Sequence, residues 1–282
     1  MSAKSGIKLL VPDEQQGTLY KWVAILTGSK NTLKGVGFFL GGVLLMAAGF
    51  KGAVIIMAVA LGLVWLASLF LLGQDLGKSK AKPKFSEILS KSRAINVLSA
   101  ARMFLFGARD VWFVVALPVY LHTVFGWDFW KVGGFMASWI IGYGFIQTIA
   151  PRITGNMEGK QPAVLWAAAL ALIPAAIAIG LAAGWSPQFV IVGGLLLFGV
   201  LFAVNSSLHS YLIVSYARGD GVSLDVGFYY MSNAAGRLLG TILSGWVYQA
   251  WGLEACLWIS SGLVAMAALL SVLLPQRRPV TA

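Results

Sequence analysis

Residues 102–118 read RMFLFGARDVWFVVALP, a run that is apolar enough for lipid and yet contains Arg102, Arg109 and Asp110. Of the 282 residues in the chain, 59% are hydrophobic and 11% are charged, whereas soluble domains carry about 25% charged residues. This composition is typical of a polytopic membrane protein. The organisation of such a chain follows from its apolar runs of about 20 residues.

Eight such runs occur along the chain. Leu, Ala, Val and Gly form long unbroken stretches, which satisfy their own backbone only as helices, whereas a barrel would show alternating segments of about ten residues. The sequence therefore predicts an all-α integral membrane protein with about eight transmembrane helices. The predicted spans are 20–49, 52–73, 94–120, 131–150, 162–183, 188–216, 225–250 and 253–274.

The basic residues predict the topology, because short cytoplasmic loops retain Lys and Arg. With both termini cytoplasmic, 14 basic residues fall on the cytoplasmic side and two, Lys51 and Lys131, on the other. Topology thus accounts for most of the net charge of +11, and no nucleic-acid partner is implied. The cytoplasmic set is Lys4, Lys8, Lys21, Lys78, Lys80, Lys82, Lys84, Lys91, Arg93, Arg152, Lys160, Arg218, Arg277 and Arg278.

The sequence predicts neither a cofactor or metal site nor a signal peptide. The single cysteine, Cys256, has no partner for an internal disulfide, and the sequence offers no metal-ligand cluster. Residues 1–19 are polar and lack the apolar core of a signal peptide. We therefore expect no metal site, no cofactor and no cleaved leader.

Five basic residues remain inside the predicted helices, namely Lys30, Lys34, Arg102, Arg109 and Arg237. Asp110 is the one carboxylate at a similar depth. An ionised side chain near the bilayer centre costs at least a few kcal/mol, so such residues usually face a protein-lined or watery interior. These six residues are the primary candidates for a functional site.

Each of these charges also has a structural explanation. Arg102 is about eight residues from the cytoplasmic end of its helix, so its side chain could snorkel to the headgroups. Arg109 could form an ion pair with Asp110 or with another helix, although adjacent residues on a helix point in different directions. Arg102 and Arg109 are seven residues apart and share a face, as do Lys30 and Lys34.

Uncharged polar residues add to the pattern. A stripe at spacings of three and four in the seventh span indicates either a water-lined wall or hydrogen bonds between helices. Asn205 and His209 are four apart in the sixth span, where either could instead bond a neighbouring backbone group. Tyr143 and Gln147 repeat the spacing in the fourth span. The stripe consists of Tyr230, Asn233, Arg237, Thr241 and Ser244.

Five interior cations against one carboxylate predict a cavity with surplus positive charge, suited to an anion. The planar guanidinium of Arg binds phosphate, arsenate or carboxylate with two parallel hydrogen bonds. A cavity for a hydrophobic cation would be acidic instead. Arg102 and Arg109 would present one face to an oxyanion, while Asp110 would hold an Arg in position or take a proton.

The longest cytoplasmic loop, residues 74–93, divides the chain into two helices (1–73) and six helices (94–282). Residues 37–42, GFFLGG, resemble the antiporter motif of the fifth helix in the major facilitator superfamily, with Phe38 in place of its Pro. Residues 158–162, EGKQP, resemble that family's basic loop motif between helices eight and nine. The resemblance implies that the chain corresponds to helices five to twelve of twelve, with Gly37, Gly41 and Gly42 allowing close helix contact.

Three longer stretches resemble the organoarsenical efflux permeases of bacterial arsenic-resistance operons: Tyr20 to Gly42, Lys91 to Leu121 and Gly134 to Arg152. This resemblance covers essentially the whole chain. It implies export of 1-arseno-3-phosphoglycerate across the bacterial inner membrane, and hence arsenate resistance. It also implies a functional partner, the glyceraldehyde-3-phosphate dehydrogenase that makes this compound when it uses arsenate in place of phosphate.

The expected mechanism is secondary active efflux, with two bundles rocking about a central anion site and with protons entering in exchange. The expected substrate-binding residues are Arg109, Arg102, Arg237, Lys34, Lys30, Asn233, Tyr230 and Asn205, and the candidate proton carriers are Asp110 and His209. Without its first four helices the chain would be unable to alternate access. The alternatives are an exporter of sugar phosphates or drugs, an inactive fragment, a membrane-embedded lipid-phosphate enzyme and an assembly subunit.

Overall fold

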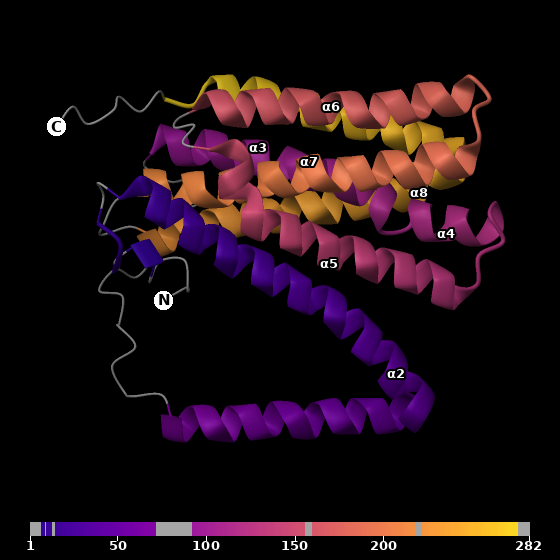
Figure 1. The fold of residues 1–282 in the computed structure, drawn as a ribbon, viewed down its shortest axis with the longest axis horizontal. Helices are drawn as coiled ribbons and strands as arrows, with labels where there is room; N and C mark the ends of the chain where they lie inside the picture. The colour runs from indigo at the N-terminus through magenta and orange to yellow at the C-terminus, as the bar shows by residue number, and fades with distance from the viewer. Residues whose placement is uncertain are drawn as a thin grey trace.

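A computed structural model describes residues 7–8, 10–12, 15–71, 92–155, 160–217 and 222–275, and these residues are helical apart from short turns. The predicted all-α fold class is confirmed. The structure contains, in chain order, α2 (Gln16–Leu71), α3 (Arg93–Phe113), α4 (Ala116–Thr123), α5 (Phe129–Thr154), α6 (Lys160–Ala182), α7 (Pro187–Tyr216) and α8 (Val222–Val272). Helices α5, α6, α7 and α8 run along the length of the molecule, whereas the first arm of α2 slants away from them and α4 is short (Figure 1).

Two of these helices, α2 and α8, each consist of two arms joined at a glycine. Gly49 has φ 65° and Gly252 has φ 78°, in the left-handed region that side chains other than glycine rarely adopt. A straight helix of 56 residues would be about 84 Å long at about 1.5 Å per residue, far more than a bilayer core of about 30 Å. Both bends fall at predicted boundaries between spans, and Figure 1 shows α2 folding back at its bend.

Among the residues that the structure describes, six stretches are long and apolar enough to cross a membrane, and the last of them contains both arms of α8. The first arm of α2 is not among them, although it coincides with the predicted span 20–49; it contains Lys21, Lys30 and Lys34. The predicted loop from residue 74 to residue 91 and the motif residues 158 and 159 lie outside the described residues. The division into domains at that loop therefore stays a prediction.

The predicted span 94–120 is interrupted rather than continuous. Pro118 has no backbone N–H, and its ring collides with the carbonyl four residues before it, so α3 ends at Phe113 and α4 starts at Ala116. The hydroxyl of Ser244 on α8 accepts hydrogen bonds from the N–H groups of Val115 (3.2 Å) and Ala116 (3.1 Å) at this break. Ser244 thus stabilises the interruption instead of lining water.

Small residues set the distance between α3 and α8. A Cβ atom on Gly236 would collide with the backbone carbonyl of Met103, and one on Gly240 would lie 2.6 Å from the carbonyl oxygen of Gly107. The backbones of the two helices are therefore in direct contact, as small residues permit between membrane helices. Because Arg237 follows Gly236 directly, this contact carries its guanidinium to Asp110 on α3, with the nitrogen and oxygen 2.9 Å apart.

A second contact of the same kind joins the first arm of α2 to α5. A Cβ on Gly28 would lie 2.5 Å from the carbonyl oxygen of Gly144, and one on Gly144 would lie 2.7 Å from the carbonyl oxygen of Gly28. One turn further along, the side-chain amide of Asn31 donates to Gln147 (2.5 Å). The first arm of α2 is thus held to the rest of the molecule by backbone contact and by a polar bond.

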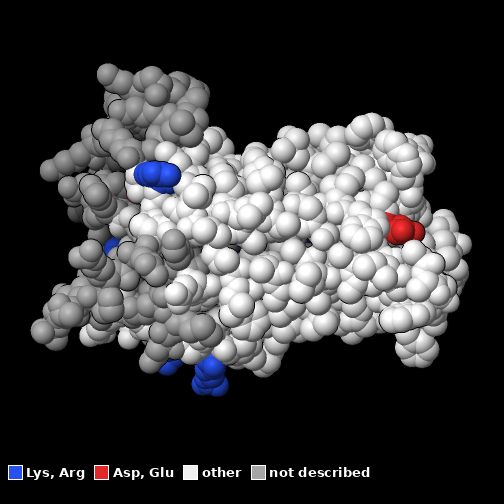
Figure 2. All heavy atoms as spheres, turned by 90° about the horizontal axis from the view of Figure 1, so that it is seen from above, with Lys and Arg blue, Asp and Glu red and all other residues white. Residues whose placement is uncertain are grey.

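The outer surface matches a lipid environment. In the view of Figure 2, the described residues between the two ends carry no charge on the visible face, with basic groups near one end and an acidic group at the other. The end with basic groups is the one where α2 begins and α8 ends (Figure 1). The second arm of α2, with Phe50, Leu61 and Phe70, exposes nearly all of its large apolar side chains.

The contact between α3 and α8 can be tested with a single added methyl group. Gly236→Ala should lower the melting temperature, because the Cβ must displace the backbone of Met103, and overpacking typically costs about 1–3 kcal/mol. Gly245→Ala, on the same helix with no atom within 4 Å of the new Cβ, should leave it unchanged or raise it, because Ala favours helix by about 1 kcal/mol over Gly.

The buried Cys256 supplies the measurement, since a thiol-reactive dye reaches it only on unfolding. Equal melting temperatures for Gly236→Ala and Gly245→Ala would contradict the close contact.

Candidate functional site

A cavity of about 890 Å³ lies between the first arm of α2 and helices α3, α4, α5 and α8. All five interior cations that the sequence singles out line this cavity, together with Asp110. The polar and charged residues of its lining are Thr27, Lys30, Asn31, Lys34, Arg102, Arg109, Asp110, Tyr143, Tyr230, Asn233 and Arg237. The structure thus collects in one place charges that are up to 207 positions apart in the sequence.

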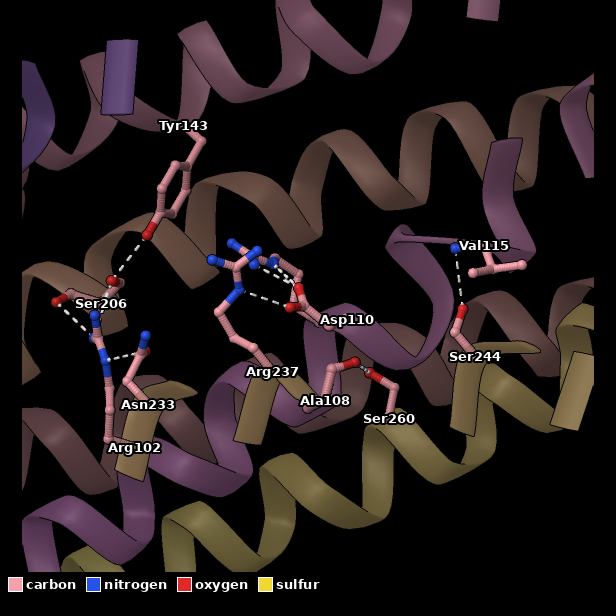
Figure 3. A network of polar contacts seen from close by, with 11 residues as sticks. Arg102, Ala108, Asp110, Val115, Tyr143, Ser206, Asn233, Arg237, Ser244 and Ser260 are labelled. Atoms are coloured by element: carbon pink, nitrogen blue, oxygen red, sulfur yellow. Dashed lines mark hydrogen bonds and ion pairs between the residues drawn. The ribbon is translucent and has the colours of Figure 1, made fainter. Parts of the chain in front are cut away.

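Asp110 is the centre of an ion-pair cluster. Its side chain is fully buried, and it pairs with Arg109 (Nε to Oδ1, 2.6 Å) on one oxygen and with Arg237 (Nε to Oδ2, 2.9 Å) on the other (Figure 3). The ion pair between Arg109 and Asp110, which the sequence left open as a structural explanation for Arg109, is therefore present although the two residues are adjacent. One carboxylate therefore partly balances two guanidinium groups.

Arg102 is fixed by bonds to two other helices. Its Nε donates to Asn233 on α8 (3.1 Å), and its Nη1 donates to both the carbonyl (3.1 Å) and the hydroxyl (3.0 Å) of Ser206 on α7. Only 4% of the residue is exposed. The alternative in which Arg102 snorkels to the headgroups is therefore wrong: partners on α7 and α8 draw the guanidinium into the bundle (Figure 3).

Phe106 separates the two arginines of α3. The guanidinium carbon of Arg102 lies 3.8 Å from the ring centroid of Phe106, and that of Arg109 lies 5.0 Å from it. The negative face of an aromatic ring attracts cations, by about 2 kcal/mol or more where water is excluded. One ring thus offsets part of the repulsion between two like charges that face the same cavity.

A chain of hydrogen bonds connects the anchored arginine to α2. The hydroxyl of Tyr143 donates to Ser206 (2.8 Å) and accepts from the amide of Gln147 (2.8 Å), and Gln147 accepts in turn from Asn31 (2.5 Å). Since Ser206 also accepts from Arg102, the chain runs from α2 through α5 and α7 to α3. We refer to Asn31, Gln147, Tyr143 and Ser206 as the relay.

The lysines of α2 complete the positive lining. Lys30 and Lys34 both line the cavity, and the ammonium of Lys30 lies 5.9 Å from the ring centroid of Tyr230 on α8. Lysine is a mobile point charge, whereas the arginines of α3 and α8 are held in defined orientations. The cavity therefore combines fixed guanidinium groups on one wall with movable ammonium groups on the other.

Some predicted residues lie elsewhere. Asn205 and His209 are fully buried on α7 and are not among the cavity-lining residues; the Asn205 amide donates to the carbonyls of Trp166 (2.8 Å) and Leu201 (3.0 Å). Gly37 lines the cavity, and a Cβ there or on Gly41 would meet no described atom within 4 Å. At Gly42 the nearest atoms belong to Trp130, at 3.5 Å. Close helix contact at these three glycines stays a prediction.

Sequence reasoning missed several residues of the site. Ser206 and Asn31 are small polar residues directly beside predicted ones, Asn205 and Lys30, and a search for partners of each buried arginine could have included them. Trp139 also lines the cavity. Its apolar character matches a lipid-facing or core position equally well, so no sequence signal distinguishes it. Phe106 and Phe113 line the cavity too, and their spacing continues the face of Arg102 and Arg109 on the same helix.

Residues 6–224 match the family model of the Major Facilitator Superfamily, which is more than three quarters of the chain. The chain belongs to the major facilitator superfamily. No curated protein matches it. Membership makes the chain a multi-pass membrane protein and a secondary transporter for a small molecule rather than an enzyme, and the match does not determine which molecule is carried.

The relay should position Arg102 for an incoming anion. Tyr143→Phe removes the hydroxyl that Ser206 and Gln147 use, and a hydrogen bond of this kind contributes about 1 kcal/mol. We expect the affinity for a phosphate monoester to fall several-fold, measured by calorimetry in lipid nanodiscs. Tyr120→Phe, outside the cavity lining, is the matched control and should bind as the wild type does; equal affinity in both variants would contradict a positioning role.

Asp110→Asn should destabilise the bundle, because it leaves two guanidinium groups facing each other without a carboxylate. Breaking a fully buried pair costs about 3–5 kcal/mol, and the cost is smaller here because the side chain of Arg237 is 49% exposed. The double variant Asp110→Asn with Arg237→Gln should recover part of the lost melting temperature. A single variant as stable as the wild type would show that the cluster contributes nothing to folding.

Proposed function

We propose that this transporter exports an organic oxyanion, and specifically 1-arseno-3-phosphoglycerate, so that it confers resistance to arsenate. The observation that carries the anion part is the convergence of five cations on one cavity with a single carboxylate among the described lining residues. A cavity with this charge attracts anions and repels cationic drugs. The arsenical part rests on the resemblance of the three stretches named above.

The two ends of the proposed substrate suit the two kinds of cation in the cavity. Its phosphate and its acyl arsenate are both tetrahedral oxyanions, each able to accept several charge-assisted hydrogen bonds. Arg109 and Arg237 share Asp110 and could together bind one oxyanion, while Lys30 and Lys34 could reach a second from the opposite wall. We assign Arg102, Tyr230 and Asn233 to the same site, with Arg102 held in place by Asn233.

The transport cycle we propose is alternating access in the inner membrane of a bacterium, with both chain termini in the cytoplasm. Proton entry in exchange for the substrate would need a protonatable carrier, and Asp110 and His209 are the candidates. A glyceraldehyde-3-phosphate dehydrogenase acting on arsenate would supply the substrate. Export of another phosphorylated metabolite is the alternative that the same cavity favours, since its charges do not distinguish phosphate from arsenate.

Binding tests the site directly, because it does not require the protein to alternate. With 3-phosphoglycerate as a stable analogue, Arg109→Gln and Lys34→Gln should each raise the dissociation constant by roughly 10- to 100-fold, since hydrogen bonds to charged groups contribute about 1.5–3 kcal/mol. Lys131→Gln, which removes a cation at the outer end of α5, should not change it. Wild-type affinity in the Arg109 variant would refute the site.

Arsenic retained by arsenate-exposed cells identifies the substrate. Cells that express a glyceraldehyde-3-phosphate dehydrogenase together with a version of this chain that carries the four further helices implied by the resemblance should retain less arsenic than cells with either protein alone. Unchanged retention, with insertion into the membrane verified, would reject the arsenical if 3-phosphoglycerate also failed to bind. Binding of 3-phosphoglycerate without lower arsenic retention would instead favour another phosphorylated metabolite as the substrate.

A further inference from the structure

The cavity is divided along its length into a cationic end and an apolar end. Along α3 the chain passes Arg102 and Arg109 before it reaches Phe113, and Pro118 follows on α4, so Phe113 and Pro118 lie further from the end where α3 begins. Helix α5 runs the other way and contributes Val132 and Met136 near its start, which is at that far end (Figure 1). The charged lining residues nearest to this far part are Arg109, whose guanidinium carbon lies 5.7 Å from the ring centroid of Phe113, and Lys34, which directly precedes the contact of Gly35 with Ala137 on α5.

The far part is a built apolar wall. It is formed by Phe113, Val114 and Pro118 from α3 and α4, and by Val132, Met136 and Ile140 from α5. Trp139 adjoins it, with its ring 4.8 Å from that of Phe113 and its N–H bonded to the carbonyl of Leu195 (2.9 Å). The indole N–H of Trp139 therefore already has a hydrogen-bond acceptor that does not line the cavity, and the indole adds only apolar surface to the lining.

A small, fully hydrophilic anion would not require this much apolar surface in its binding site. The cavity volume of about 890 Å³ is near the upper end of the range of about 300–1,000 Å³ for drug-sized ligands. A doubly charged metabolite at the cationic end would leave the apolar end filled with water, whose displacement by an apolar group is favourable. Met136 adds an adaptable side chain that tolerates groups of different shape.

We propose that the cavity also accepts amphipathic organic anions, with the oxyanion among the arginines and lysines and an attached apolar group at the far end between Phe113 and Met136. The proposal rests on the anion site of the proposed function and adds a substrate class to it. An apolar outer gate that never contacts substrate is the competing explanation for the same wall.

A homologous series of alkyl phosphates separates these explanations. Binding of methyl, butyl and hexyl phosphate is measured with the chain in lipid nanodiscs, and empty nanodiscs correct for partition into lipid. Burial of one CH₂ group strengthens binding by at most roughly fourfold. We expect hexyl phosphate to bind at least about tenfold more tightly than methyl phosphate, and hexyltrimethylammonium, with the same chain and the opposite charge, not to bind.

Adjacent glycines on α5 provide a matched pair of variants. Gly133 lines the cavity and Gly134 does not, and a Cβ on either would meet no described atom within 4 Å. Gly133→Leu should fill the apolar end and reduce the affinity for hexyl phosphate to near that for methyl phosphate, while methyl phosphate still binds and so reports a folded site. Gly134→Leu should keep the full dependence on chain length.

Each outcome decides the question. Equal affinity for methyl and hexyl phosphate, or an unchanged preference in Gly133→Leu, would overturn the amphipathic class and leave the anion site standing. Binding of hexyl phosphate that survives Arg109→Gln would also overturn it, because the headgroup would then play no part. Failure of all three phosphates to bind would refute the anion site itself, and this proposal with it.

Discussion

The ion pairs of Asp110 are the interaction on which the rest of the site depends. Charged groups in the interior of a membrane protein persist only where partners compensate their desolvation. Here one fully buried carboxylate holds Arg109 from its own helix and Arg237 from α8. The pairing is possible because Gly236 and Gly240 bring the α8 backbone into contact with α3. The close packing at these two glycines, which carry no charge, thus determines where the charged groups of Asp110 and Arg237 lie.

A similar dependence links α2 to the cavity. The first arm of α2 lies against α5 through Gly28 and Gly144, and the relay then continues from Asn31 to Arg102 across four helices. A movement of α2 relative to α5 would stretch the bond between Asn31 and Gln147 and so relax the constraint on Tyr143. The orientation of the cavity-lining Arg102 is therefore connected to the position of a helix that itself contributes Lys30 and Lys34 to the cavity.

The charged residues of this site could be predicted from the sequence, whereas the contacts between them could not. A cation within an apolar run is costly, so Lys30, Lys34, Arg102, Arg109 and Arg237 could be found by position alone, and all five line one cavity. The bend at Gly49 fell at a predicted boundary. Pairing across helices could not be predicted, since it depends on which glycine faces which backbone. For Ser244 the sequence left open a water-lined wall or a bond between helices, and the structure shows bonds to the backbone at the break between α3 and α4.

The apolar part of the cavity could not be predicted for a different reason. In a membrane protein Phe113 and Met136 have the composition of a lipid-facing surface, of a packed core and of a cavity wall alike, and hydropathy does not separate these three environments. Only the positions of α2 and α8 around them reveal that they border open space. For the same reason the sequence predicted a site for an anion and gave no indication of an apolar wall beside it.

The charge of the cavity also constrains how export could be driven. A proton bound to Asp110 would remove the acceptor that Arg109 and Arg237 share, leaving both guanidinium groups for the anion, so proton and anion would favour each other's binding. Exchange requires the opposite, that the two compete. An anion leaving a cell that is negative inside already gains about 2.3 kcal/mol per charge for each 100 mV. Exchange with protons would therefore need a carrier outside this cluster, and His209 is the remaining candidate, buried on α7 with neither ring nitrogen bonded to a described residue.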